Sequence, residues 1–266
     1  MITRVFNKTN RALLAELVRT DFKLRYQGSV LGYAWSLLRP LLLFLILYIV
    51  FVRFLKIGGD IPHFPVYLLL GIVLWNFFAE MTSQSLGSIV NRGDLVRKIR
   101  IPRWIIVLSS SISALINLFL NLLVVILFLF INEVDLLETT LWLPLILLEI
   151  YVFALGLSLF LAAAFVKYRD INYIWEVILQ AGFYLTPILY PITLITNPAL
   201  QKLMLLNPMA QAIQDARYAT ITHQTVISRQ VLQGGLKYTP YLLVILVLLA
   251  ALRYFRQQSK FFAENI

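Results

Sequence analysis

Six apolar stretches determine what this 266-residue chain can fold into. An α-helix needs about 20 apolar residues to cross a hydrocarbon layer of roughly 30 Å, and continuous runs of this length lack the alternation of a transmembrane β-barrel. The stretches cover residues 33–54, 64–86, 104–130, 141–166, 171–190 and 238–254. We therefore expect a single all-α integral membrane domain, 1–266, with six transmembrane helices.

The composition agrees with this class and excludes several kinds of site. Hydrophobic residues make up 60 % of the chain and charged residues 14 %, against roughly 25 % charged in soluble domains. The net charge of +10 gathers at the ends of the apolar runs, which suits anionic membrane lipids and not nucleic acid. The chain has no cysteine, and His63 and His223 lie in separate predicted loops. We therefore expect no disulfide and no metal site.

A basic loop, residues 87–103, predicts the orientation of the chain. It separates two apolar runs and carries five positive residues. Short loops rich in Lys and Arg stay in the cytoplasm. Most other Lys and Arg residues fall on the same side, whereas loop 131–140 has acidic residues and no basic one. We expect both termini in the cytoplasm and loop 131–140 outside.

The middle of this basic loop predicts a short amphipathic helix. An acidic residue at its start and basic residues near its end suit the helix dipole. The helix either only holds the orientation of the chain or docks a cytoplasmic partner. Its residues are Asp94, Leu95, Val96, Arg97, Lys98 and Ile99.

Two further segments predict helices at the membrane surface. Apolar residues recur at helical spacing in 7–27, opposite a polar face, which favours a helix lying in the interface over an ordinary solvated one. Prolines divide the segment 186–237 into short pieces, so we expect two short helices in 197–221. These helices either re-enter the membrane beside a cavity or lie on the external surface.

Charged residues inside the predicted spans are candidates for function, because each costs at least ~2.5 kcal/mol near mid-bilayer. We expect Arg39 to pair with Glu80 or Glu176, since all three lie near the cytoplasmic ends of their spans. Glu149 lies deeper and is the candidate for a proton relay.

Aromatic and amide side chains recur on one face of the first and fifth spans. Such a face makes weak contacts with sugar rings without gripping one sugar, which suits a polymer conduit; the alternative is packing or lipid contact. The candidate channel-lining residues are Phe44, Tyr48, Phe51, Gln180, Phe183 and Tyr184.

The sequence offers no catalytic machinery. No G-x-x-x-x-G-K-[ST] phosphate-binding loop occurs, and the external carboxylates are scattered without a motif. We expect a transport subunit that does not hydrolyse ATP by itself.

Three sets of motifs, in order along nearly the whole chain, resemble the membrane subunits of type-2 ABC exporters of polysaccharides, the permeases for O-antigen, capsule and teichoic acid. The first set, before and within the first span, is the most specific of the three. The motifs are Arg25-Tyr26, Ser29-Val-Leu-Gly32, Trp35 and Pro40; Leu95-Val-Arg-Lys-Ile-Arg-Ile-Pro102; and Arg169-Asp-Ile171, Thr186-Pro-Ile-Leu-Tyr-Pro191 and Asn207-Pro-Met209.

The resemblance implies a homodimer in the cytoplasmic (inner) membrane, each copy docked on a separate ATP-binding subunit that carries the ATP and Mg²⁺. It makes the helix 94–99 the coupling helix, the first and fifth spans the lining of the conduit, and the helices in 197–221 an external gate. A lipid-linked glycan would enter beside the interface helix. The residues expected to hold its diphosphate are Arg19, Lys23, Arg25 and Tyr26.

The expected function is therefore ATP-driven export of a lipid-linked polysaccharide, with O-antigen as the first candidate cargo. Two alternatives stay open. The same architecture exports drugs or small lipids, and a proton-coupled secondary carrier would use Glu149.

Overall fold

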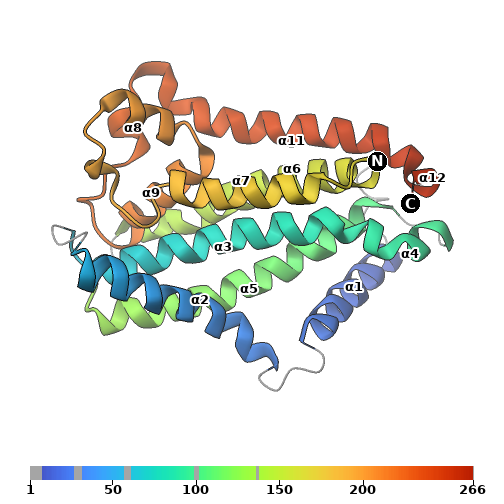
Figure 1. Ribbon diagram of the computed structural model, residues 1–266, viewed down its shortest axis with the longest axis horizontal. Helices are drawn as coiled ribbons and strands as arrows, with labels where there is room; N and C mark the ends of the chain where they lie inside the picture. Colours follow the sequence, from blue (N-terminus) through green and yellow to red (C-terminus); the bar gives the residue numbers. More distant parts are fainter. Residues whose placement is uncertain (1–7, 27–31, 57–60, 99–101, 136–137, 266) are drawn as a thin grey trace.

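The computed structural model describes residues 8–26, 32–56, 61–98, 102–135 and 138–265. These residues form a bundle of helices, and none of them lies in a β-strand. Figure 1 shows the long helices side by side, with short helices gathered at the two ends of the bundle. The predicted all-α class is confirmed.

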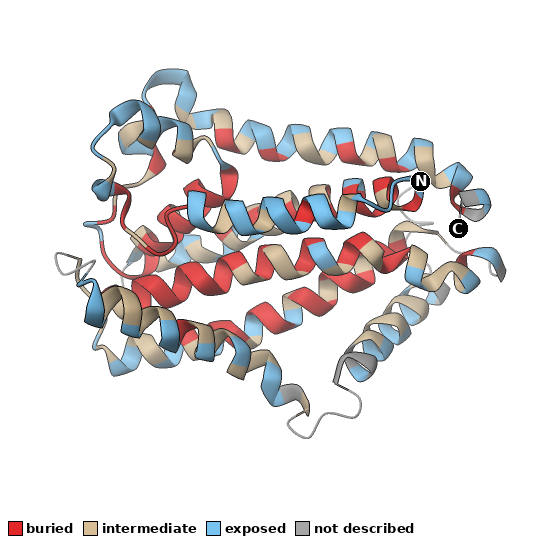
Figure 2. Cartoon of the chain, in the orientation of Figure 1, coloured by how far each residue is buried: buried red, intermediate tan, exposed pale blue. Residues whose placement is uncertain are grey.

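Helix α3 (Phe64–Ser88) is the centre of the bundle. It packs against α5 (Trp104–Ile131), α6 (Leu143–Lys167) and α9 (Pro208–Thr220). Its sequence is apolar on every side, and 78 % of its most apolar stretch is buried. Figure 2 shows this helix as the most continuously buried element. A helix that is hydrophobic all round is stable only when neighbours surround it.

The first predicted span has the opposite character. Helix α2 (Trp35–Leu47) continues as a π-helical segment, Tyr48–Phe54, and only 6 % of its most apolar stretch is buried within the chain. π-helical turns inside α-helices are rare and occur frequently at functional sites. A membrane-spanning helix with so few contacts in its own chain leaves a large apolar face for lipid or another subunit.

Helix α11 (Thr239–Gln258) runs along α6, and a glycine sets how closely they approach. A Cβ atom on Gly156 of α6 would lie 3.1 Å from the Cα atom of Leu248 in α11. Small residues at a helix crossing permit this approach in membrane proteins, where van der Waals packing contributes much of the association.

Five described helices are long and apolar enough to cross a membrane, and the helix in the fifth predicted span, 171–190, is not among them. Helix α7 (Ile171–Leu185) has 15 residues, which corresponds to about 22 Å. It ends because Thr186 precedes a proline, which disfavours the helical conformation, and Thr186 is extended with ψ 137°. The expected six spans are thus confirmed for five.

The short helices lie at opposite ends of the bundle (Figure 1). At one end α8 (Pro198–Leu205) and α9 each begin with proline, and the preceding asparagine caps the helix. Asn197 Oδ1 accepts from the Ala199 N–H at 2.9 Å, and Asn207 Oδ1 accepts from the Met209 N–H at 3.0 Å. We call this the α8–α9 end.

At the other end lie α4 (Gly93–Lys98) and the C-terminal α12 (Phe262–Asn265), which pack on each other. Helix α1 (Lys8–Tyr26) packs against the first part of α5 near this end. We call this the α4 end.

Candidate coupling and entry site

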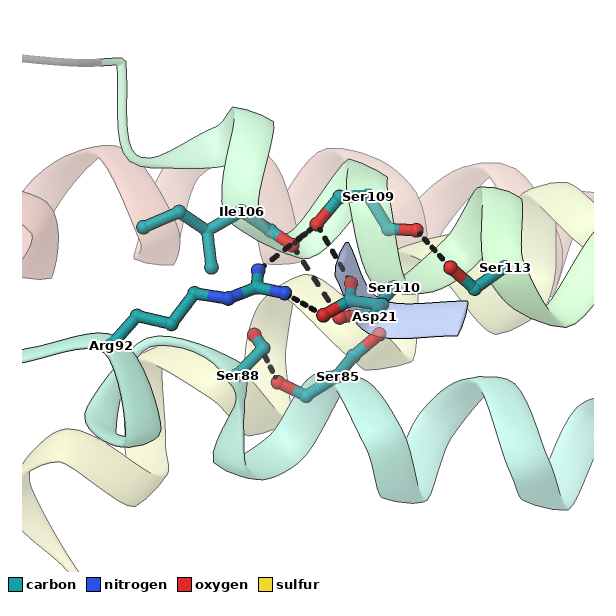
Figure 3. Close-up of polar contacts among 8 residues, drawn as sticks. All are labelled: Asp21, Ser85, Ser88, Arg92, Ile106, Ser109, Ser110 and Ser113. Carbon is teal, nitrogen blue, oxygen red and sulfur yellow. Dashed lines mark hydrogen bonds and ion pairs between the residues drawn. The ribbon is translucent and has the colours of Figure 1, made fainter. Parts of the chain in front are cut away.

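An ion pair ties α1 to the segment that leads into α4. Arg92 lies in the turn Val90–Arg92 between α3 and α4, and its Nη2 pairs with Asp21 Oδ1 of α1. Its Nη1 donates to Ser109 Oγ of α5 at 3.0 Å. Figure 3 shows the three side chains meeting between the helices. Arg92 and Asp21 are 19 % and 23 % exposed, so the pair is partly shielded from solvent.

Small hydroxyl residues make room for this guanidinium. Serines of α3 and α5 surround it, and most of their hydroxyls donate to carbonyls of their own helices (Figure 3). Ser109 Oγ, for example, donates to the Ile106 carbonyl at 2.8 Å, and Ser88 Oγ donates to the Ser85 carbonyl at 2.7 Å. These small side chains let α3 and α5 approach closely, although the buried Ser85 hydroxyl has no hydrogen-bond partner among the described residues.

Helix α4 is anchored on one side and exposed on the other. Val96 is buried in an apolar cluster with Ile106 of α5 and with Phe255 and Phe262 of the C-terminal segment. Asp94 and Arg97 are exposed, and Leu95 is half-buried. The side chain of Lys98, and Ile99 as a whole, lie outside the described residues. The inner face of α4 therefore packs against the start of α5 and the end of α11.

The C-terminal segment completes this support. Arg103 donates to the Ser259 carbonyl, and its guanidinium lies 6.0 Å from the centre of the Phe262 ring. No local signal in the sequence connects the C-terminus with α4, because the two segments are about 160 residues apart.

A cavity of about 660 Å³ lies between α1 and α5. Aliphatic side chains of both helices form its walls, and two arginines of α1, Arg11 and Arg19, also line it. Of the predicted entry residues, Arg19 therefore lines the cavity and Lys23 is exposed on α1. The side chains of Arg25 and Tyr26 lie outside the description. Arg11 was missed by the sequence reasoning, although it lies two helical turns before Arg19 on the same face.

The predicted channel residues divide into two groups. Phe44 is buried with its ring edge-on to Phe128 at 5.4 Å, and Phe183 packs on Trp75 at 6.2 Å. Both rings therefore contact other residues of their own subunit.

The remaining channel candidates are more accessible. Tyr48 and Phe51 are half-buried, whereas Gln180 and Tyr184 of α7 are exposed. Glu176, Gln180 and Tyr184 are all exposed and follow one another at intervals of four residues, so they lie along one face of α7.

Among the intramembrane charges, Glu80 has polar partners other than the predicted Arg39. Glu80 accepts hydrogen bonds from Asn117 of α5 and from Gln84, the latter at 2.9 Å. Arg39 and Glu176 are exposed, and no ion pair within the described part of the chain joins Arg39 to Glu80 or Glu176. Glu149 lies at the α8–α9 end, where Gln211 of α9 donates to it at 3.5 Å.

A fully buried arginine that the sequence reasoning missed holds α9 in place. Arg217 is 0 % exposed and donates to the carbonyls of Tyr67 (3.0 Å), Pro187 (2.6 Å) and Ile188 (2.7 Å) and to Gln214 Oε1 (2.9 Å). Its guanidinium also lies 3.6 Å from the centre of the Tyr67 ring. Burial lowers the pKa of Arg217, and the contact with Tyr67 opposes this shift. One side chain thus connects α9, α3 and the segment after α7.

The sequence of this chain is similar to those of known transport proteins. The sequence pattern of the family described as ABC-2 type transporter matches residues 12–221. The O-antigen export system permease protein RfbA of Myxococcus xanthus is 31 % identical over 259 residues, which cover 96 % of each chain. An O-antigen export system permease protein RfbA of Klebsiella pneumoniae is 30 % identical over 202 residues, 76 % of this chain and 77 % of that protein. With the family pattern covering most of the chain, and a relative similar over nearly its whole length, the chain belongs to the ABC-2 type transporter family.

Proposed function

We propose that this chain is the membrane subunit of an ATP-driven exporter that moves a lipid-linked polysaccharide of the O-antigen type across the cytoplasmic membrane. The observation that carries the proposal is the similarity, over 96 % of both chains, to a protein named as an O-antigen export permease. Membership of a transporter family makes the chain a transport component and not an enzyme. ATP and Mg²⁺ belong to a separate ATP-binding partner.

The partner docks on α4 in this proposal. The exposed Arg97 and Asp94 face it, and the buried Val96 passes its movement to α5 and α11. The basic residues of loop 87–103 support a cytoplasmic location for this end and for both termini. The α8–α9 end then lies outside, where the two short helices act as a re-entrant gate.

A second copy of the chain completes the conduit. Two observations support this step. Only 6 % of the most apolar stretch of α2 and its π-helical continuation is buried within the chain, and α7 exposes Glu176, Gln180 and Tyr184 along one line. Polar side chains facing lipid are costly, so this line requires a water-filled path or a protein neighbour. Two copies that meet through α2 and α7 supply a protein neighbour and enclose a water-filled path. In this dimer α7 serves as the sixth span despite its length.

The glycan enters at the cavity between α1 and α5. Its aliphatic walls suit a lipid chain, and Arg11 and Arg19 suit the diphosphate that joins the lipid to the sugar. ATP binding closes the two partner subunits, the movement presses on α4, and the copies separate enough to pass the polymer. Because the Asp21–Arg92 pair joins α1 to the segment before α4, the entry helix α1 moves together with α4.

Reversing the exposed charge on α4 should separate ATP hydrolysis from transport. In Arg97→Glu, we expect the complex with the ATP-binding partner to retain most of its ATP hydrolysis while export falls about tenfold or more, because the altered contact transmits less of the movement. ATP hydrolysis and surface glycan are measured in parallel. Arg253→Glu, an exposed charge reversal on α11, should leave both unchanged; equal coupling in the two variants would remove α4 from the proposed role.

The cargo is tested with the purified complex of this chain and its partner. Lipid-linked glycan should stimulate ATP hydrolysis, and Arg11→Gln/Arg19→Gln should require about tenfold more glycan for the same stimulation, because two charge-assisted phosphate contacts are lost. Glu16→Gln, an exposed change on the same helix, is the matched control. Stimulation by small apolar drugs but not by glycan would instead identify a small-molecule exporter.

A further inference from the structure

A second cavity, of about 620 Å³, lies at the α8–α9 end between α6, α9 and α11. The proposed transport path through α2 and α7 does not use it. Its polar lining residues include Glu149, Asp215, Arg229 and Tyr241, and its apolar lining comes mainly from α6 and α11. The cavity is therefore amphipathic, and it lies where two membrane-spanning helices meet a short helix outside the spans.

The polar part of this cavity has acceptors that the protein does not satisfy. Gln211 of α9 is 0 % exposed and donates Nε2 to Asp215 Oδ2 at 2.8 Å, and the Tyr241 hydroxyl donates to the same oxygen at 3.3 Å. Glu149 Oε1, Asp215 Oδ1 and Gln211 Oε1 are buried without a hydrogen-bond partner among the described residues. Buried acceptors are normally paired, so three in one place point to a ligand that brings donors.

The charged residues that line the cavity indicate what kind of ligand would supply these donors. Two carboxylates, Glu149 and Asp215, face one guanidinium, Arg229, which is exposed at the rim. Burial raises the pKa of Asp215, and the hydrogen bonds from Gln211 and Tyr241 and the charge of Arg229 oppose that shift. The excess of negative groups calls for a cation, and the neighbouring Arg229 calls for an anion beside it.

The apolar part of the cavity is open to lipid chains. Leu145 and Leu148 of α6 and Ile245 of α11 are each more than half exposed on membrane-spanning helices. Trp142 at the start of α6 is also exposed, as is typical of tryptophan at a membrane interface. Glu149 lies six residues beyond Leu143, the first residue of α6, or about 9 Å along the helix. Its carboxylate is thus near the level of lipid headgroups.

We propose that this cavity binds an aminophospholipid, with its primary ammonium between Glu149 and Asp215, its phosphate beside Arg229 and its acyl chains along α6 and α11. A primary ammonium brings three N–H donors for the three unsatisfied acceptors. A choline headgroup has the charge without the donors, and a phosphoglycerol headgroup lacks the cation. The lipid would fill the contact between α9 and the two spans, and so stabilise the α8–α9 end.

The test compares headgroups on the wild-type complex, so that it needs no altered protein. The full chain with its ATP-binding partner is placed in nanodiscs of phosphatidylethanolamine, phosphatidylcholine and phosphatidylglycerol in equal amounts, then extracted in mild detergent. Mass spectrometry of the retained lipids should show phosphatidylethanolamine enriched about tenfold over each of the others. Equal retention of the three lipids would overturn the proposal.

A charge-neutral variant locates the site. In Glu149→Gln/Asp215→Asn, which preserves shape, the enrichment should disappear, whereas Glu138→Gln, an exposed carboxylate outside the cavity lining at the same end, should keep it. Full enrichment in the double variant would place the lipid elsewhere and contradict the proposal. If soluble oligosaccharide from the glycan displaced phosphatidylethanolamine, the cavity would be a sugar-binding site, and the lipid proposal would be wrong. The proposed export function would not be affected by this result.

Discussion

Arg217→Ala is expected to deprive the protein of most of its folded population. The change removes the donor of the Pro187 and Ile188 carbonyls and one of the donors to the Gln214 amide oxygen, which also accepts from the Tyr67 hydroxyl at 3.1 Å. Each buried acceptor left unsatisfied costs about 1–3 kcal/mol, and the cavity left by the side chain adds to this loss, so the total is comparable with the ~5–15 kcal/mol that separates a typical native state from the unfolded one. The measurement is the melting temperature and yield of purified protein. Lys202→Ala, on the exposed face of α8, should change neither.

A double-mutant cycle separates this network from a general sensitivity of α9. A Cβ atom on Gly71 of α3 would lie 2.3 Å from Arg217 Nη2, so Gly71→Ala alone should destabilise the protein by displacing the guanidinium. With Arg217 already replaced by alanine, the same methyl group has room, and the two losses should be clearly less than additive. Additive losses, or an Arg217→Ala protein as stable as the Lys202→Ala control, would refute this description of the network.

A second large effect, on export, is expected from changes to the ion pair between Asp21 of α1 and Arg92 before α4. Asp21→Arg and Arg92→Asp each place two like charges next to Ser109 in a partly buried site, and we expect export to fall about tenfold or more. The exchanged pair, Asp21→Arg/Arg92→Asp, restores opposite charges and should recover most of the export. Surface glycan is measured at matched protein levels.

The control for the exchange is Glu16→Arg, an exposed charge reversal on α1, which should export normally. A double variant no better than either single change would mean that Asp21 and Arg92 act separately. A single variant with full export would remove the pair from the entry and coupling site altogether.

Local signals made the helices of this chain predictable. The two asparagine–proline pairs that precede α8 and α9 act through atoms at most two residues away, since each asparagine caps the first turn of its own helix. The length of each apolar run similarly reports the length of its helix. The fifth run was misjudged because its apolar character continues past Leu185, while Thr186 and Pro187 end the helix there.

The functional contacts were less predictable because their partners are distant in sequence. Asp21 and Arg92 are 71 residues apart, and Arg217 reaches a carbonyl 150 residues away; nothing in the local sequence of either arginine distinguishes it from an exposed one. Phe44 and Phe183 share the helical spacing of the channel candidates, but spacing alone does not say whether the neighbouring surface belongs to the same chain. Arg11 was detectable, because it shares a face of α1 with Arg19.

The most direct test of the proposed export function is to deplete the protein in its host and measure two pools of glycan. Lipid-linked glycan on the cytoplasmic side and polymer at the cell surface are quantified over the same time course. We predict that the internal pool accumulates while new surface polymer is lost, and that re-expression of the wild-type chain, but not of Arg97→Glu, reverses both changes. Unchanged pools after depletion would contradict polysaccharide export by this chain.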